Sequence, residues 1–233
     1  MDQGIFAKPM HSLTLDTPWG LGEENYGRII RALSSKNVEL IVEFGSGTST
    51  VRLCKDFPRA KITSVEHQRQ FRRQTVGLLR EHKLSNVVVR DCPIARRYFG
   101  IRSYLTYDLT AEKLKDGIDF VLIDGPVESE TLRGREAPLY MVFPHVKLGG
   151  LIALHDYHRA SAKAVVKNWL NSYKENLRVI EEYERIILLK KCGHQGKPSY
   201  PGIYSIIDNF YANIRLAIRT LKRFIGSIIK VKG

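Results

Sequence analysis

Short apolar runs alternate with helix-like segments along most of the chain. Strand length and apolar content single out five runs: Glu39–Phe44, Lys61–Glu66, Asn86–Arg90, Asp119–Asp124 and Gly150–His155. A turn signal or a polar segment follows each run, and the helical spacing of Gln68–His82 and Ala160–Tyr173 predicts helices there. This alternation is typical of a parallel sheet with helices on both faces.

Two further runs, Arg178–Tyr183 and Arg185–Lys190, lie too close together for a crossover helix, and they predict an antiparallel pair that closes the sheet. We therefore expect an α/β fold, a doubly wound, mostly parallel seven-stranded sheet with an antiparallel edge strand. Residues 38–207 would form this domain, residues 1–37 an N-terminal helical or lid segment, and residues 208–233 a C-terminal helix.

The turn after the first run carries the strongest chemical signal. It reads VEFGSGTST, and Gly45 and Gly47 let the backbone turn tightly and let a ligand lie against it. Ligands of such sheets bind outside the carboxyl ends of the strands, near the point where strand order reverses. The dinucleotide fingerprint needs Gly or Ala where Thr50 stands and does not ask for an acid at Glu43. The turn therefore predicts a nucleotide-type ligand other than NAD.

This turn resembles the first motif of the class I S-adenosylmethionine-dependent methyltransferases. In chain order, the family's second to fifth strands resemble KITSVEH, VVVRDCP, IDFVLIDGP and VKLGGLIALHDYHR. IDGP and the HDYHR segment are especially similar to the small-molecule and sugar O-methyltransferase branches, among them the catechol-type enzymes. The resemblance covers about Val38 to Lys190 and implies a Rossmann-like methyltransferase fold with S-adenosylmethionine as cofactor.

The resemblance also implies which residues hold the methyl donor. Glu43 would brace the glycine turn and approach the donor's amino group, Glu66 would bind the ribose diol, and the adenine edge would lie beside Asp91. The alternative for Glu66 is a solvated acid, and for Cys92 a small buried apolar residue. The full expected set is Glu43, Gly45, Ser46, Gly47, Thr48, Glu66, His67, Asp91, Cys92 and Asp124.

Methyl transfer from S-adenosylmethionine requires mainly that the nucleophile be positioned, because the methyl group of a sulfonium is already activated. The enzyme places a nucleophile in line with it and, for a hydroxyl or an amine, removes a proton. Candidates stand at the ends of the fourth and fifth strands, and histidine has the pKa best suited to a base near neutrality. For His158, an exposed position in the first turn of a helix is an equal alternative. The expected catalytic residues are Asp124, His155, Asp156 and His158.

Catechol-type relatives hold magnesium with an acid after the fourth strand and an Asp-Asn pair after the fifth. Asp124 and Asp156 match two of these positions, but Tyr157 stands where the amide ligand belongs. Magnesium prefers carboxylate, carbonyl and water oxygens. We therefore expect a metal-independent base, with a metal site at Asp124 and Asp156 as the weaker alternative.

The formal net charge of +13 predicts anionic partners. Some arginines near the predicted site could bind a carboxylate or phosphate, or stand in solvated loops: Arg96, Arg97, Arg102, Arg133 and Arg135. We expect a small-molecule or glycan acceptor and leave open whether it is anionic or lipid-linked. One alternative is a nucleic-acid methyltransferase, disfavoured because DGPV replaces the aromatic-proline motif of that class. Another is a noncatalytic membrane-associated protein.

The C-terminal stretch NFYANIRLAIRTLKRFIGSIIKVKG combines apolar residues at helical spacing with basic residues and no acid. This predicts a basic amphipathic helix, which could pack on its own domain, form a homodimer, bind a partner groove or lie on an anionic membrane. Three dispersed cysteines do not form a disulfide framework, and the sequence shows neither a signal peptide nor a membrane-spanning run. We expect a cytoplasmic protein, with membrane contact at its periphery at most.

Overall fold

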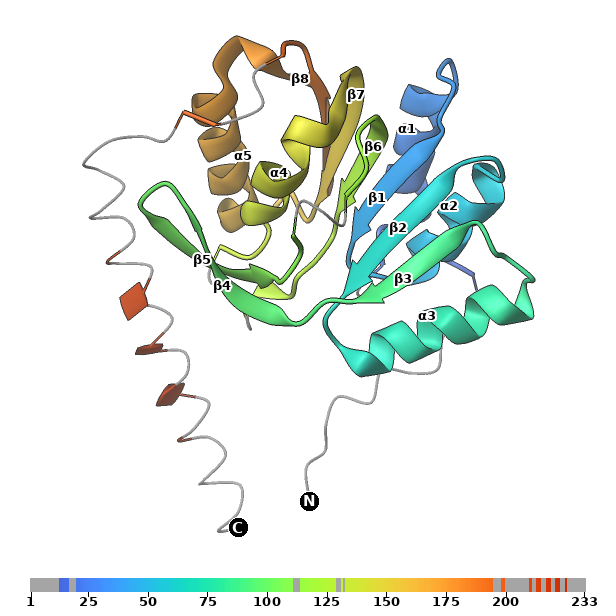
Figure 1. Cartoon of the computed structure of the whole chain (residues 1–233), viewed down its shortest axis with the longest axis horizontal. Helices are drawn as coiled ribbons and strands as arrows, with labels where there is room; N and C mark the ends of the chain where they lie inside the picture. Colours follow the sequence, from blue (N-terminus) through green and yellow to red (C-terminus); the bar gives the residue numbers. More distant parts are fainter. Residues whose placement is uncertain are drawn as a thin grey trace.

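Seven strands form the main sheet of the part of the chain that the structure describes (Figure 1). The computed structural model describes residues 13–16, 20–110, 114–128, 131, 133–194, 198–199, 210, 213–214, 217–218, 221–222 and 225. The strands of this sheet are β1 (Leu40–Phe44), β2 (Lys61–Glu66), β3 (Val87–Asp91), β6 (Ile118–Ile123), β7 (Val146–His155), β8 (Leu177–Tyr183) and β9 (Ile186–Lys191).

The sheet has the order β3-β2-β1-β6-β7-β9-β8. The first five strands in this order pair in parallel, whereas β9 is antiparallel to both of its neighbours. The expected doubly wound, mostly parallel sheet is confirmed, and the antiparallel strand lies one place in from the edge strand β8. Strand order reverses between β1 and β6, so a ligand site is expected outside the carboxyl ends of these two strands.

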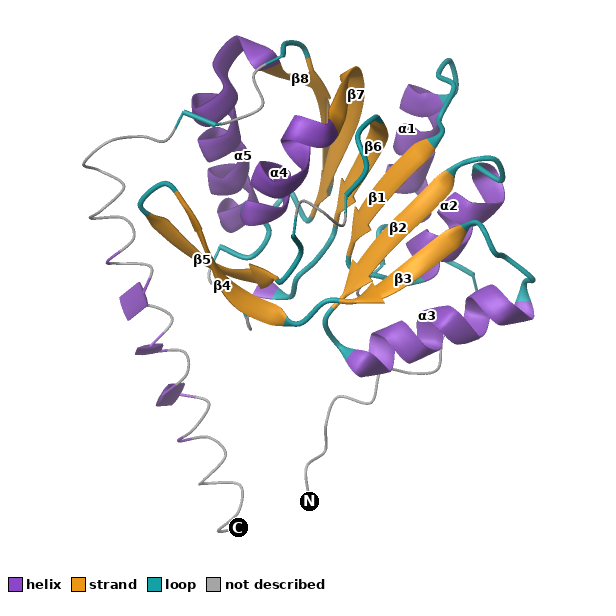
Figure 2. Cartoon of the chain, viewed as in Figure 1, coloured by secondary structure: helices purple, strands orange, loops and turns teal. Residues whose placement is uncertain are grey.

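Helices cover both faces of the sheet (Figure 2). Alternate side chains of β6 point to opposite faces: Phe120 joins the core beneath one layer, and Val121 joins the core beneath the other. Because both faces are covered, every residue of β6 is buried. The first layer contains α1 (Glu23–Leu33), α2 (Thr48–Asp56) and α3 (Arg69–Glu81). The second contains α4 (Ala137–Val142) and α5 (Ala160–Tyr173), each followed by a short 3-10 turn, at Phe143–His145 and Lys174–Asn176.

Helix α1 comes from the stretch for which the sequence allowed a lid or a helix on the sheet edge. Its Tyr26, Ile29 and Leu33 are buried and belong to the same core as Ile41 of β1. The Tyr26 hydroxyl also donates to Asp56 at the end of α2, at 2.7 Å. Residues 23–33 are therefore part of the packed domain.

A hairpin of β4 (Ile94–Phe99) and β5 (Arg102–Tyr107) forms a separate two-stranded sheet that the sequence did not predict. It is anchored by Glu136, a buried carboxylate just before α4. One Glu136 oxygen accepts hydrogen bonds from Arg102 and from the hydroxyls of Tyr104 and Tyr140, at 3.1, 3.1 and 2.9 Å. A buried charge is stable only when it is paired and hydrogen-bonded, so this cluster fixes the hairpin against α4.

The helix predicted over residues 208–233 lies largely outside the described residues. Eight of its positions are described, and all eight have helical conformation. None of the described helices has the length and apolar content needed to cross a membrane.

Candidate active site

The glycine turn after β1 packs against the turn after β6. Gly45 has a φ of +95°, and a Cβ there would lie 2.9 Å from the Gly125 nitrogen. A Cβ on Gly125 would in turn lie 3.0 Å from the Gly45 Cα. A Cβ on Gly47 would meet nothing within 4 Å. Gly45 is thus required by backbone packing and by its left-handed conformation, whereas Gly47 leaves open space at the start of α2.

Glu43 lies beneath this turn and is fully buried. Its carboxylate accepts hydrogen bonds from Ser49 Oγ at 2.6 Å, Thr50 Oγ1 at 2.5 Å and Ser64 Oγ at 2.7 Å. Burial raises the pKa of Glu43 to about 7, although the hydroxyl donors oppose this rise. The side chain therefore ties β1, β2 and α2 together beneath the turn.

Glu66 joins the end of β2 to the same turn. Its Oε2 accepts the N–H of Ser46 at 3.0 Å, and its Oε1 accepts the N–H groups of His67 and Gln68 at 2.8 Å each. A carboxylate offers about four acceptor positions, so Oε2 can still receive a hydrogen bond from a ligand hydroxyl. This capacity beside the open space at Gly47 fits a nucleoside ligand.

The other residues expected to hold the donor lie around these two acids. Thr48 is the buried first residue of α2, and Ser46 Oγ lies 3.1 Å from Thr75 Oγ1 of α3. Asp91 is the exposed last residue of β3. Cys92 is buried, and its N–H donates to the Glu66 carbonyl at 2.8 Å. Strands β1, β2 and β3 thus bring all of these residues to one edge of the sheet.

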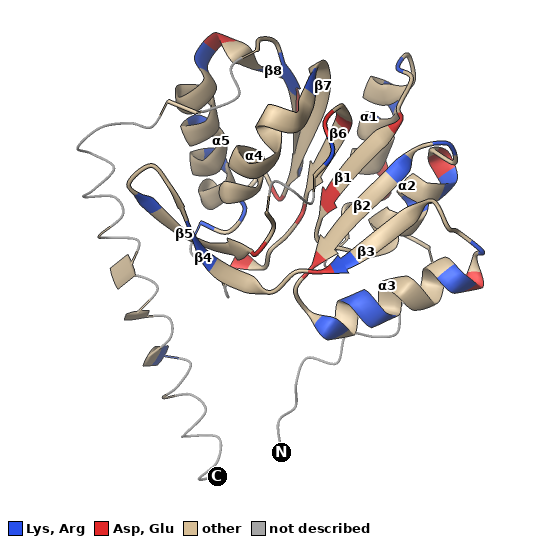
Figure 3. Cartoon of the chain, viewed as in Figure 1, with Lys and Arg blue, Asp and Glu red and all other residues tan. Residues whose placement is uncertain are grey.

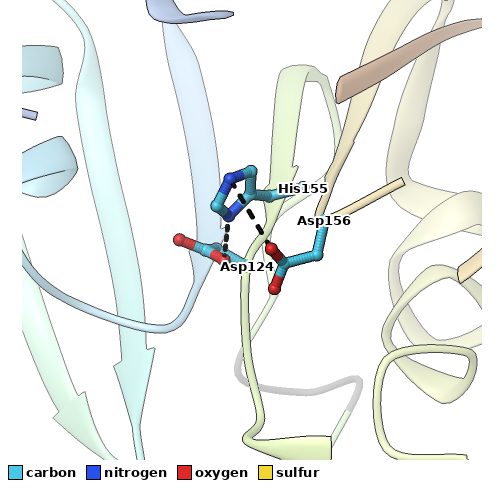
Figure 4. A group of neighbouring side chains, drawn as sticks. All are labelled: Asp124, His155 and Asp156. Atoms are coloured by element: carbon cyan, nitrogen blue, oxygen red, sulfur yellow. Dashed lines mark hydrogen bonds and ion pairs between the residues drawn. The ribbon is translucent and has the colours of Figure 1, made fainter. Parts of the chain in front are cut away.

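The ends of β6 and β7 place Asp124 beside His155 (Figure 4). Asp124 Oδ1 lies 2.7 Å from His155 Nδ1, and the His155 Nε2 has no hydrogen-bond partner among the described residues. The two side chains differ in access, since that of Asp124 is 20% exposed and that of His155 only 1%. Burial raises the pKa of Asp124, but attraction to His155 and Arg135 outweighs burial and holds that pKa below its ordinary value.

Residues 42–157, which span these turns, match the family model of a methyltransferase domain. The chain belongs to the class I S-adenosylmethionine-dependent methyltransferases. The methyltransferase uses S-adenosylmethionine as its cofactor, as the glycine turn and the strand-end acids indicated. No curated protein matches the chain.

Solved structures share the fold of this methyltransferase at low sequence identity. A SAM-dependent O-methyltransferase from Thermotoga maritima matches with a TM-score of 0.53 at 14% identity, over 75% of this chain and 67% of that chain. A precorrin-6y C5,15-methyltransferase from Geobacter metallireducens matches with a TM-score of 0.53 at 15% identity, over 74% and 88%. A Streptococcus mutans protein classed as a methyltransferase and solved with SAH matches with a TM-score of 0.50 at 15% identity, over 71% and 97%.

Asp156 of the methyltransferase is surrounded by arginines. Its Oδ2 accepts from Arg135 at 3.0 Å and lies 3.1 Å from Arg159, and its Oδ1 accepts from Arg185 at 2.8 Å. Burial raises the pKa of Asp156, but these cations and His155 reverse the effect and bring it to about 2. Asp156 therefore remains ionised and neutralised by its neighbours, which suits an anchor of the turn better than a proton acceptor.

The residues of this cluster fit a magnesium ion poorly. Possible ligand atoms of Asp124, His155 and Asp156 lie within 4.8 Å of one another, which is close enough to hold an ion. However, guanidinium groups already engage both Asp156 oxygens, and Asp124 Oδ1 is engaged by His155. The surrounding arginines would also repel a divalent cation. Metal removal is therefore a discriminating experiment for this enzyme.

The expected base His158 is exposed, and no hydrogen bond or ion pair between described residues joins it to this cluster. Tyr107, at the end of β5, was not among the expected site residues. Its ring packs on that of His67 with centroids 5.6 Å apart, and its fully buried hydroxyl has no hydrogen-bond partner among the described residues. The strand pattern of residues 102–107 is the feature of the sequence that indicates Tyr107.

Arginines that were expected to grip an anionic acceptor are partly occupied by carboxylates of the protein itself. Arg97 pairs with Asp108, Arg102 with the buried Glu136, and Arg135 with Asp156. Arg102 and Arg135 therefore neutralise carboxylates of the protein itself. The net charge of the chain does not by itself predict an anionic acceptor.

Proposed function

We propose that the enzyme methylates a hydroxyl oxygen of a small molecule or glycan. The observation that carries this proposal is the dyad of Asp124 and His155, because transfer to a hydroxyl needs an oriented proton acceptor and transfer to many other nucleophiles does not. When bound, S-adenosylmethionine supplies an activated methyl group, so the protein has to position the acceptor oxygen and receive its proton.

Asp124 is the member of the dyad that faces the acceptor in this proposal. The Asp124 side chain is partly exposed, whereas the imidazole of His155 is buried. His155 Nδ1–H would donate to Oδ1 and orient the carboxylate, leaving Oδ2 to receive the proton of the acceptor hydroxyl. His155 is then a positioning residue, in contrast to the sequence-based expectation that a histidine would be the base.

The donor lies, we propose, between Glu66 and the glycine turn. The free acceptor capacity of Glu66 Oε2 suits one ribose hydroxyl, and the open space at Gly47 allows the amino-acid portion to lie against the backbone. We propose that Asp91, which is exposed at the end of β3, borders the adenine. The glycine turn after β1 and the turn after β6 lie where strand order reverses, which is the position expected for ligands of this fold.

Titration calorimetry with S-adenosylmethionine tests the donor site, with NAD as the comparison ligand. We expect binding of S-adenosylmethionine only, weakened at least about tenfold by Glu66→Ala, because one charge-assisted hydrogen bond to a buried carboxylate is lost. Glu81→Ala, at an exposed acid of α3, is the matched control. Equal binding by the wild type and Glu66→Ala would show that Glu66 does not hold the donor.

The acceptor class is tested by donor turnover against panels of phenolic compounds, sugars and short RNAs. We expect methyl ethers to form on members of the first or second panel, identified by their mass and by their stability to mild base. Methylation confined to RNA would replace the proposed function with nucleic-acid modification.

A further inference from the structure

The C-terminal segment presents a row of solvent-exposed apolar side chains. Phe210, Ile214, Ile218, Leu221 and Ile225 recur every three or four residues, have helical conformation, and are between 39% and 64% exposed. Such spacing aligns side chains along one face of a helix. Large contiguous apolar patches are rare on soluble monomers and mark docking surfaces.

The β4–β5 hairpin is joined to this segment and carries exposed apolar side chains of its own. Arg96 of β4 donates to Asn213 Oδ1 at 3.3 Å, which joins the hairpin to the C-terminal segment. At the hairpin turn, Tyr98 and Ile101 are 67% and 51% exposed. We call these seven apolar side chains the docking surface: Tyr98, Ile101, Phe210, Ile214, Ile218, Leu221 and Ile225.

The charged residues in the sequence of the C-terminal segment have one sign. From Asn209 to the end of the chain the sequence contains no acid, and its basic residues are Arg215, Arg219, Lys222, Arg223, Lys230 and Lys232. Figure 3 shows further basic residues along the hairpin. A second copy of the chain would bring a second set of these cations against the first, which is unfavourable. An anionic lipid surface provides both an apolar layer for the docking surface and phosphates for the cations.

We propose that the enzyme docks on anionic bilayers through this surface. The apolar side chains enter the boundary between headgroups and acyl chains, and the basic residues lie among the headgroups. The hairpin also connects this surface to the active site, because Tyr107 at its end contacts Gly125 beside Asp124. Docking therefore places the site near the headgroups, within reach of a lipid-linked acceptor, a consequence that rests on the proposed function.

Vesicle flotation of the full chain tests the docking. We expect binding to phosphatidylcholine vesicles that contain phosphatidylglycerol, and little binding to pure phosphatidylcholine. Ile214→Asp combined with Ile218→Asp should weaken binding at least about tenfold, because apolar contact is lost and two anions are added. Leu148→Asp, at an apolar residue of β7 that is 56% exposed outside the docking surface, should bind like the wild type.

The proposal is overturned if the wild type does not float with anionic vesicles, if it floats equally with both vesicle types, or if the double variant binds unchanged. A different result would assign the surface to a second copy of the chain. In that case light scattering would give the mass of a dimer for the wild type and of a monomer for the double variant, and neither would bind vesicles. Binding of RNA with steep salt dependence and without vesicle binding would assign it to nucleic acid. Calorimetry with S-adenosylmethionine on the same variants should be unaffected, so failure of docking and failure of the proposed function are distinguishable.

Discussion

Asp124 and His155 form a pair in which a buried imidazole supports a more accessible carboxylate. Their Oδ1 and Nδ1 atoms lie 2.7 Å apart; Asp124 directly follows β6, and His155 is the last residue of the neighbouring parallel strand β7. Parallel strands deliver their last side chains to the same edge of a sheet, so residues 31 positions apart in the sequence meet there. The pair stands beside the glycine turn, where the methyl donor would be placed.

Removal of the carboxylate should impair chemistry most. We expect Asp124→Asn to lower kcat by about 10²- to 10⁴-fold, the usual contribution of a positioned base. His155→Gln should lower kcat less and move the acidic limb of the pH–rate profile to higher pH. The shift follows because His155 helps to lower the pKa of Asp124, and its loss lets that pKa rise.

Initial rates across a pH series check this pair of variants. His194→Gln, at an exposed histidine after β9, is the control and should behave like the wild type. If His158→Gln removes transfer while Asp124→Asn does not, the base has been assigned to the wrong side chain.

Substitution of the two glycines of the turn should affect different properties: Gly45→Ala should lower stability, and Gly47→Ala should weaken donor binding. Gly45→Ala should destabilise the fold by roughly 1–3 kcal/mol, because its φ is +95° and its Cβ would press on the Gly125 nitrogen. Gly47→Ala should change stability by less than about 0.5 kcal/mol and weaken donor binding, because its Cβ would enter the open space proposed for the donor. Urea unfolding and calorimetry distinguish the two outcomes. Equal donor affinity for Gly47→Ala and the wild type would place the donor elsewhere.

Glu43 should make stability depend on pH. Its pKa is raised from 4.5 to about 7 by burial, so the folded state holds a proton that the unfolded state has released within this range. The contribution of protonated Glu43 to stability is complete below the unfolded pKa and is lost as pH rises through the folded pKa. The loss amounts to roughly 3 kcal/mol. In Glu43→Gln this dependence should disappear.

Urea midpoints of the wild type and Glu43→Gln across this range provide the measurement, and the difference between the two curves isolates Glu43 from other titrating groups. Parallel curves would mean that the carboxyl titrates at its ordinary pKa in the folded protein.

Removal of Glu136, which anchors the hairpin, should lower the free energy of unfolding substantially. Glu136→Ala should destabilise the protein by roughly 3–5 kcal/mol, because Arg102 would remain buried without its counter-charge. Glu175→Ala, at an exposed acid after α5, should cost less than about 0.5 kcal/mol. Thermal unfolding of both variants makes the comparison. A small effect of Glu136→Ala would show that the hairpin is held mainly by apolar contacts.

Metal removal should leave methyl transfer unchanged. The oxygens of Asp156 are engaged by Arg135 and Arg185, and these cations oppose a divalent ion. Turnover is measured after dialysis against a chelator and again after magnesium is added. Restoration of lost activity by magnesium would establish a metal site at Asp124, His155 and Asp156.

Local patterns were sufficient for the frame of the molecule. The apolar run of β6 and the glycine pair after β1 are recognisable in the sequence itself, although the packing that requires Gly45 comes from Gly125, which is distant in the sequence. The hairpin was missed because three of its buried residues, Arg102, Ser103 and Thr106, are polar. Arg102 and Thr106 are satisfied by partners 34 and 28 residues further along the chain. A local apolar pattern cannot signal such burial, since the compensating groups come from distant segments.

The sequence by itself determined the parallel sheet, the glycine turn and the family, because period-two apolar runs and turn residues act over short range. Only the tertiary structure distinguishes the acid that we propose to face the acceptor from the acid that arginines neutralise. Asp124 and Asp156 are both acids at strand ends, yet Arg135 and Arg185 neutralise one, and His155 supports the other. Their roles differ because the electrostatics of a carboxylate depends on the groups that the fold brings around it.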